Sequence, residues 1–62
     1  MKKGFYYIVS NSGRIIWVYT SCGLALMDLT AMWAAGNCGL NIVYNETILY
    51  RLTQNGIEKI GA

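Results

Sequence analysis

The sequence predicts an α+β fold in which a single helix packs on a four- to five-stranded antiparallel sheet, with the elements in the order ββαβββ. Three observations favour this fold. A run of helix formers at residues 21–37 lies between two segments rich in aromatic and β-branched residues. Turn signals divide both of those segments into pieces of strand length. Hairpins on either side of one helix are typical of an antiparallel sheet that the helix covers on one face.

Two strands are expected before the helix, at residues 4–10 (GFYYIVS) and 15–20 (IIWVYT). The turn between them is expected at residues 11–14, where Gly13 can adopt a positive φ. With Ser12 and Gly13 as a two-residue turn, strand alternation gives the hairpin two apolar faces. The face expected to pack on the helix holds Phe5, Tyr7, Val9, Ile16 and Val18, and the outer face holds Tyr6, Ile8, Trp17 and Tyr19.

The helix is expected to begin after Thr20 or Ser21 as its N-cap and to end at Gly36 or Asn37. Its apolar residues lie on nearly all sides, whereas a surface helix usually has one polar face. The mostly small face expected to lie on the sheet holds Leu24, Met27, Ala31, Ala34 and Ala35, and the opposite face holds Leu26, Leu29 and Trp33. The opposite face is covered either by loops and chain ends or by a second protein molecule.

Three strands are expected after the helix, at residues 40–44, 47–53 and 57–60. Asn45-Glu46 is the expected tight turn between the first two, and Asn55-Gly56, a strong hairpin signal, precedes the third. One face is predicted to hold Val43, Ile48, Tyr50, Leu52 and Ile57, and the other Ile42, Leu49, Arg51 and Ile60.

The 62 residues are expected to form one domain that spans positions 1–62. A domain of this size buries only about 60% of the surface that its unfolded chain exposes. Because 55% of the residues are apolar, we expect a protein partner or a second copy of the chain to cover some of them, and the second copy would make a homodimer. The net charge is only +2 and the basic residues are scattered, which disfavours nucleic acid as the main partner.

Neither a membrane-spanning segment nor a signal peptide is expected, and we therefore predict a cytoplasmic chain. The longest uncharged run, residues 29–45, is interrupted by glycine and asparagine, and the apolar run at residues 4–9 is short. Cys22 and Cys38 flank a helix about 18 Å long, whereas a disulfide needs Cα atoms within about 7 Å. Both are expected to be reduced thiols, with an intermolecular disulfide as the alternative.

The sequence contains no catalytic, cofactor or metal-binding motif, so we expect no enzyme and no cofactor. Histidine is absent, and two cysteines without histidine are too few for a zinc site. Cys22 at the helix N-terminus lacks a neighbouring base that would activate it. Asp28 is the one acid in the helix, and it is expected to pair with Arg14 or Arg51 or to mark the solvent edge.

The expected function is that of a small protein-interaction module, because large amphipathic aromatic residues anchor many protein interfaces. The predicted partner-binding residues are Tyr6, Ile8, Trp17, Tyr19, Leu26, Leu29 and Trp33. The leading hypothesis is a phage or mobile-element inhibitor that sterically blocks a host enzyme or defence complex. The alternatives are a structural homodimer subunit and a single-strand nucleic-acid-binding protein that stacks bases on Tyr6, Trp17 and Tyr19.

Overall fold

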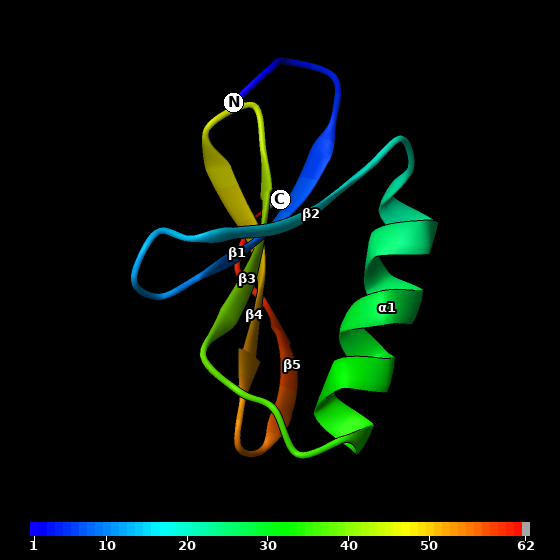
Figure 1. The fold of residues 1–62 in the computed structure, drawn as a ribbon, viewed down its shortest axis with the longest axis vertical. Coiled ribbons are helices and arrows are strands. Elements are labelled where there is room, and N and C mark those ends of the chain that lie inside the picture. Colours follow the sequence, from blue (N-terminus) through cyan, green and yellow to red (C-terminus); the bar gives the residue numbers. More distant parts are fainter. Residues whose placement is uncertain (62) are drawn as a thin grey trace.

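The computed structural model describes residues 1–61 and confirms one helix with five antiparallel strands in the order ββαβββ. The strands form a single sheet in the spatial order β2-β1-β3-β4-β5. In Figure 1 the helix stands beside this sheet, which is strongly twisted and seen close to edge-on. The elements are β1 (Tyr6–Ser10), β2 (Ile15–Tyr19), α1 (Cys22–Ala34), β3 (Leu40–Tyr44), β4 (Thr47–Thr53) and β5 (Gly56–Lys59).

The first hairpin has its predicted register except beside the turn. The confirmed pairs are Tyr6 with Tyr19, Tyr7 with Val18, and Ile8 with Trp17. Val9 lies opposite Ile15 rather than Ile16, because a β-bulge interrupts the ladder there. The Ser10 N–H donates to the Arg14 carbonyl over 2.8 Å, which leaves a three-residue loop rather than two residues. Loops of this length need a residue with positive φ near their end, and Gly13 supplies it at 90°.

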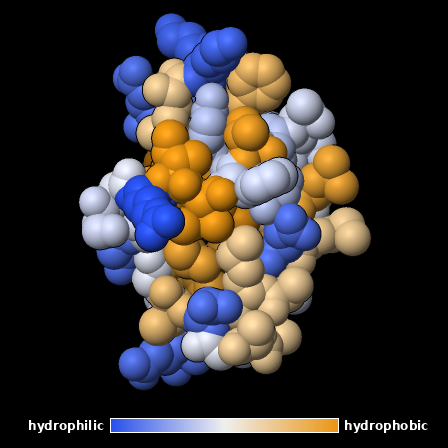
Figure 2. Space-filling view, in the orientation of Figure 1, coloured by the Kyte–Doolittle hydropathy of each residue, from blue (hydrophilic) through white to orange (hydrophobic). Residues whose placement is uncertain are grey.

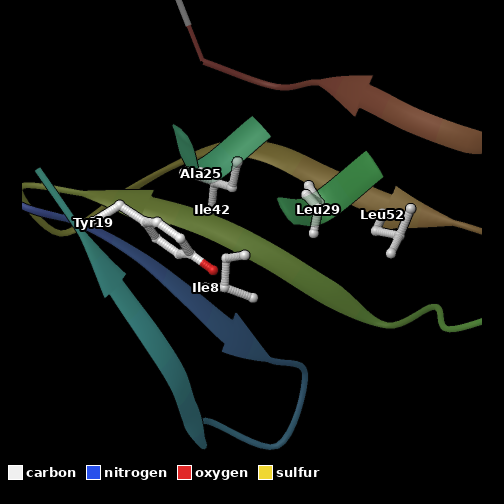
Figure 3. Packing of buried hydrophobic residues seen from close by; sticks show 6 residues of the cluster. All are labelled: Ile8, Tyr19, Ala25, Leu29, Ile42 and Leu52. Atoms are coloured by element: carbon white, nitrogen blue, oxygen red, sulfur yellow. The ribbon is translucent and has the colours of Figure 1, made fainter. Parts of the chain in front are cut away.

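The sheet face that packs on the helix is the one predicted to lie outside. Ile8, Tyr19, Ile42 and Leu52 are buried against Ala25 and Leu29 of the helix, as Figure 3 shows. The opposite face of the sheet, which the helix does not cover, is called the open face. It carries the buried residues Tyr7, Val9 and Val43, with Phe5 and Ile48 packed against them.

The helix packs on the face that it does because a row with polar and charged side chains crosses the other, open face. Val9, Asn41, Arg51 and Glu58 lie opposite one another on four successive strands. A helix packed there would remove two charged side chains from water, which costs several kcal/mol per ion unless they are fully paired. The equivalent row on the other face, Ser10, Leu40, Leu52 and Ile57, contains no charge, and Lys59, the one charged strand residue on that face, lies exposed at the end of β5.

The helix is likewise turned the other way from the prediction. Leu26, Leu29 and Met32 pack towards the sheet beside the small Ala25. The residues predicted to touch the sheet are exposed instead, namely Leu24, Met27, Ala31, Ala34 and Ala35. Burial of leucine and methionine removes more apolar area from water than burial of alanine, so the larger face is the one that the sheet covers.

The predicted helix ends are confirmed by their hydrogen bonds. The Ser21 side chain accepts from the Leu24 N–H over 3.2 Å as the N-cap. At the other end Gly36 has a φ of 91°, and its N–H donates to the Trp33 carbonyl. A left-handed residue here turns the chain away from the helix axis while the last carbonyls stay hydrogen-bonded.

A second bulge, in β4, overturns the predicted faces of the C-terminal strands. Val43 lies opposite Ile48 and Ile42 lies opposite Tyr50, so Leu49 is an extra residue in the ladder. Ile48 and Tyr50 therefore lie on opposite faces rather than on one. The Leu49 carbonyl accepts hydrogen bonds from the N–H groups of residues 60 and 61, which fixes these two residues against the bulge.

Both C-terminal turns occur close to their predicted positions. Asn45 and Glu46 have φ angles of 48° and 68°, as expected for the tight turn between β3 and β4. In the next hairpin Thr53 lies opposite Gly56, so Gln54 and Asn55 form the loop and Gly56 opens β5. The fifth strand thus begins one residue earlier than predicted.

Candidate interaction surface

The most exposed apolar surface lies on β2, which forms one edge of the sheet. Within the described residues 1–61, β2 pairs with β1 alone, so its outer backbone groups have no strand partner. We call its four consecutive exposed side chains, Ile15, Ile16, Trp17 and Val18, the β2 edge. In the orientation of Figure 1, Figure 2 shows hydrophobic atoms gathered near the middle of the molecule, where β2 crosses the other strands.

Trp17 is the largest side chain of the β2 edge. It pairs with Ile8, so it projects from the face that the helix covers. The helix does not cover Trp17 itself, and 64% of this side chain remains exposed. A bulky amphipathic ring in this position can be buried by a partner at little cost in conformational entropy.

The opposite edge of the sheet is built differently. β5 carries Glu58 and Lys59, both of which are exposed, and α1 packs beside it. The Trp33 ring lies over Gly56, where an added Cβ would meet it at 3.8 Å. Charges protect an edge strand against unwanted pairing and β2 carries none, although the bulge at Ile16 twists part of this edge.

Three of the predicted partner-binding residues lie inside the protein. Ile8 and Leu29 are fully buried and Tyr19 is 9% exposed, so these three belong to the core and not to the exposed surface of the described chain. The cause is the reversal of both the sheet face and the helix face described above. Tyr6 and Leu26 are half-buried beside the same core. Trp17 and Trp33 alone of the seven are exposed.

Only one of the three aromatic residues expected to stack nucleic-acid bases is exposed. The Tyr6 ring already stacks on Tyr44, with ring centroids 4.3 Å apart. The Tyr19 hydroxyl donates a hydrogen bond of 2.7 Å to the Asp28 carboxylate. Trp17 therefore lacks the aromatic neighbours that a base-stacking platform uses.

The Tyr19–Asp28 hydrogen bond ties the end of β2 to the helix. Burial, together with this hydrogen bond and the negative charge of Asp28, raises the pKa of Tyr19 to about 12. Asp28 was expected to pair with Arg14 or Arg51 or to mark the solvent edge. It is exposed at the edge of the helix, and its hydrogen-bond partner is a tyrosine rather than an arginine.

Trp33 lines a shallow hollow of about 180 Å³ at the C-terminal end of the helix. The other lining residues are Gly36, Asn37, Cys38 and Gln54. Cys38 is an exposed free thiol, and Cys22, at the other end of the helix, is also free. The hollow contains no carboxylate or basic group, so the residues present offer little chemistry for a ligand.

A polar cluster on the open face has a structural role. Asn41 is buried, and its amide donates to the Val9 carbonyl over 3.2 Å and to the Asn11 side chain over 2.9 Å. The Arg51 Nε donates to the Asn41 side-chain oxygen over 3.4 Å. These bonds satisfy a buried amide and join β1, β3 and β4.

Within residues 1–61, no group of three or more potential metal ligands comes together. No helix within the described residues is long and apolar enough to cross a membrane. Comparisons with protein-family models, with curated proteins and with solved structures find no match.

The sequence reasoning identified Trp17 but missed its three neighbours, Ile15, Ile16 and Val18. It placed Ile16 and Val18 in the core because their alternation with Trp17 implied a buried inner face. A signal was nevertheless present, since IIWV is a run of four apolar residues without a charge. Such a run indicates a strand that is apolar on both faces, but it does not tell whether that strand lies at an edge.

Proposed function

We propose that this chain is a non-enzymatic protein-interaction module that binds its partner through the β2 edge. One observation carries the proposal: four consecutive apolar side chains are exposed on a strand that, within residues 1–61, has no neighbouring strand on its outer side. Exposed hydrophobic edge strands are sites at which another chain adds a strand.

Binding would proceed by strand addition. The partner's backbone continues the hydrogen-bonded ladder beyond β2 and supplies much of the affinity, while side chains on alternate faces supply specificity. Trp17 is the anchor that we expect to contribute most, because interface hot spots are enriched in tryptophan. The sheet behind β2 is held by three further strand pairings and by the helix, so the edge is a rigid platform.

The effect on a bound protein would be steric. A segment of the partner that is held extended along β2 is no longer free to make its other contacts. The module also covers the partner's surface beside that segment. This action needs no catalytic group and no cofactor.

The test compares Trp17→Ala with Trp33→Ala, because both residues are exposed tryptophans but only Trp17 lies on the β2 edge. Immobilised wild-type protein is incubated with extract of the native host, the retained protein is identified, and its affinity for each purified variant is measured by calorimetry. We expect Trp17→Ala to weaken binding by at least about 30-fold, a hot-spot loss of about 2 kcal/mol, and Trp33→Ala to leave it unchanged.

Equal affinity of wild type and Trp17→Ala for every retained protein would contradict the proposal. Binding of mixed-sequence oligonucleotides that weakens steeply with salt would instead favour the nucleic-acid alternative.

A further inference from the structure

We infer that the partner seated on the β2 edge is a second copy of this chain, whose β2 pairs antiparallel with the first in a two-fold symmetric dimer. The inference rests on the proposed function, because it names the occupant of the same surface. The dimer would join two five-stranded sheets into one sheet of ten strands.

The backbone of β2 defines what can bind there. An edge strand presents alternating free N–H and C=O groups on its outer side, and only another extended segment can pair with a row of them. Every copy of this chain carries one such free segment, which β1 holds in a regular extended conformation at Trp17–Tyr19, and the bulge at Ile16 separates it from Ile15. A preorganised strand pairs at a lower entropic cost than a flexible peptide does.

Charge favours self-pairing at this edge and not at the other. Residues Ile15–Tyr19 contain no charged side chain, so antiparallel pairing brings no like charges opposite each other. Arg14 precedes the strand, and the antiparallel arrangement places the two copies of Arg14 at opposite ends of the shared ladder. At the β5 edge two of the four strand residues, Glu58 and Lys59, are charged and exposed, so pairing there would remove charges from water.

Symmetry decides which side chains meet. Two adjacent antiparallel edges are related by a two-fold axis perpendicular to the sheet, which places both helices on the same face. Trp17 projects from that face, so the two Trp17 rings lie on the sheet surface between the helices. There each ring can be covered by the other copy.

The helix flank that looks towards β2 extends this surface. Asp28 marks the flank, because its carboxylate accepts from Tyr19 at the end of β2. Leu24 lies one helical turn earlier on the same side and is 51% exposed. The area between the two helices of a dimer is thus bordered by Leu24 and contains Trp17.

The size of the surface sets the expected strength of the dimer. A specific interface at the small end of the usual range buries about 600 Å² per partner. One protomer exposes 4131 Å² in all, so such an interface would cover roughly one seventh of it. Five strand residues with the neighbouring helix flank are compatible with this smaller size. We therefore expect a dimer that dissociates on dilution.

The test measures mass by sedimentation equilibrium from low to high protein concentration. Wild type is expected to pass from one chain to two, while Val18→Lys and Trp17→Ala raise the dimer dissociation constant by at least about 30-fold. Val18→Lys is the sharper variant, because a charge on an exposed edge position opposes strand pairing without removing a core side chain. Met27→Lys, on the exposed side of the helix, is the matched control and should dimerise like wild type.

Hydrogen exchange supplies a second measurement that reports strand pairing itself. The β2 amides that point outwards should exchange more slowly at concentrations at which the dimer forms, whereas β5 amides should be unaffected. Circular dichroism of each variant confirms that it is folded before its mass is interpreted.

Each remaining outcome overturns a defined claim. A single-chain mass for wild type at every concentration overturns the dimer, and if a Trp17-dependent protein partner is nevertheless found, the proposed function stands. A dimer that Met27→Lys dissociates and Val18→Lys does not would place the interface on the helix and overturn the inference. If neither self-association nor any other protein binding depends on Trp17, both proposals fail.

Discussion

At the scale of single residues, Tyr19 and Asp28 show how a polar atom is accommodated in a small apolar core. The Tyr19 ring packs among Ile8, Ala25 and Leu29, and its hydroxyl reaches the Asp28 carboxylate at the solvent edge. A hydroxyl on a buried ring is destabilising when it has no partner, and the Asp28 carboxylate supplies that partner. The sequence indicated that Asp28 needed a partner or water, but it could not identify a tyrosine as that partner.

This bond makes the stability depend on pH at the alkaline end. Because the pKa of Tyr19 rises from 10.0 to about 12 on folding, its contribution is fully present below pH 10 and is lost as the pH approaches 12. We expect the free energy of unfolding, measured in urea from pH 8 to 12, to fall less steeply for Tyr19→Phe than for wild type. At pH 8 the same variant should be less stable by about 1 kcal/mol. Identical slopes would show that Tyr19 does not carry this dependence.

At the scale of elements, local signals predicted the strands and turns well and the faces badly. The bounds of β3 and β4 match the predicted residues 40–44 and 47–53, and the register of three pairs in the first hairpin is confirmed. The two bulges were missed because Ile16 and Leu49 are ordinary strand residues with nothing to distinguish them. One extra residue moves every later side chain to the other face, so a missed bulge has a large effect.

The orientation of the helix gives a direct test at this scale. Leu29 is fully buried against the sheet, and Met27 is 69% exposed. Leu29→Ala should lower the free energy of unfolding by about 2–5 kcal/mol, and Met27→Ala should change it by less than about 0.5 kcal/mol. If the helix instead packed on the sheet through the predicted face with Met27, Met27→Ala would be more destabilising than Leu29→Ala. Urea unfolding of the two variants, followed by circular dichroism, decides between the orientations.

At the scale of the whole molecule, the fold class was predictable and the arrangement of its surfaces was not. Helix and sheet are both apolar on two sides, so periodicity defines which residues share a face without telling which face is buried. The feature that decides which sheet face the helix covers is the polar row through Asn41, Arg51 and Glu58. This row becomes visible only once the strand order is known. For the same reason the candidate site was predicted only in part. Trp17 was predicted to bind a partner, but that β2 is an edge follows from the pairing of β1 with β3.

That central pairing also has a consequence for how fast the chain folds. β1–β2 and β3–β4–β5 are built from neighbouring segments, whereas β1 and β3 pair across long sequence separations, such as the 32 positions from Val9 to Asn41. Closing that long loop costs chain entropy before any contact compensates for it, so we expect it to form the kinetic barrier.

In stopped-flow refolding, Ile42→Val in β3 should therefore slow the folding rate, while Ile57→Val in β5 should mainly accelerate unfolding. The opposite assignment of the two effects would place the nucleus in the C-terminal hairpin. If the barrier lies where we expect, a nascent chain has to extend past β3 before the first hairpin can be captured into a stable sheet.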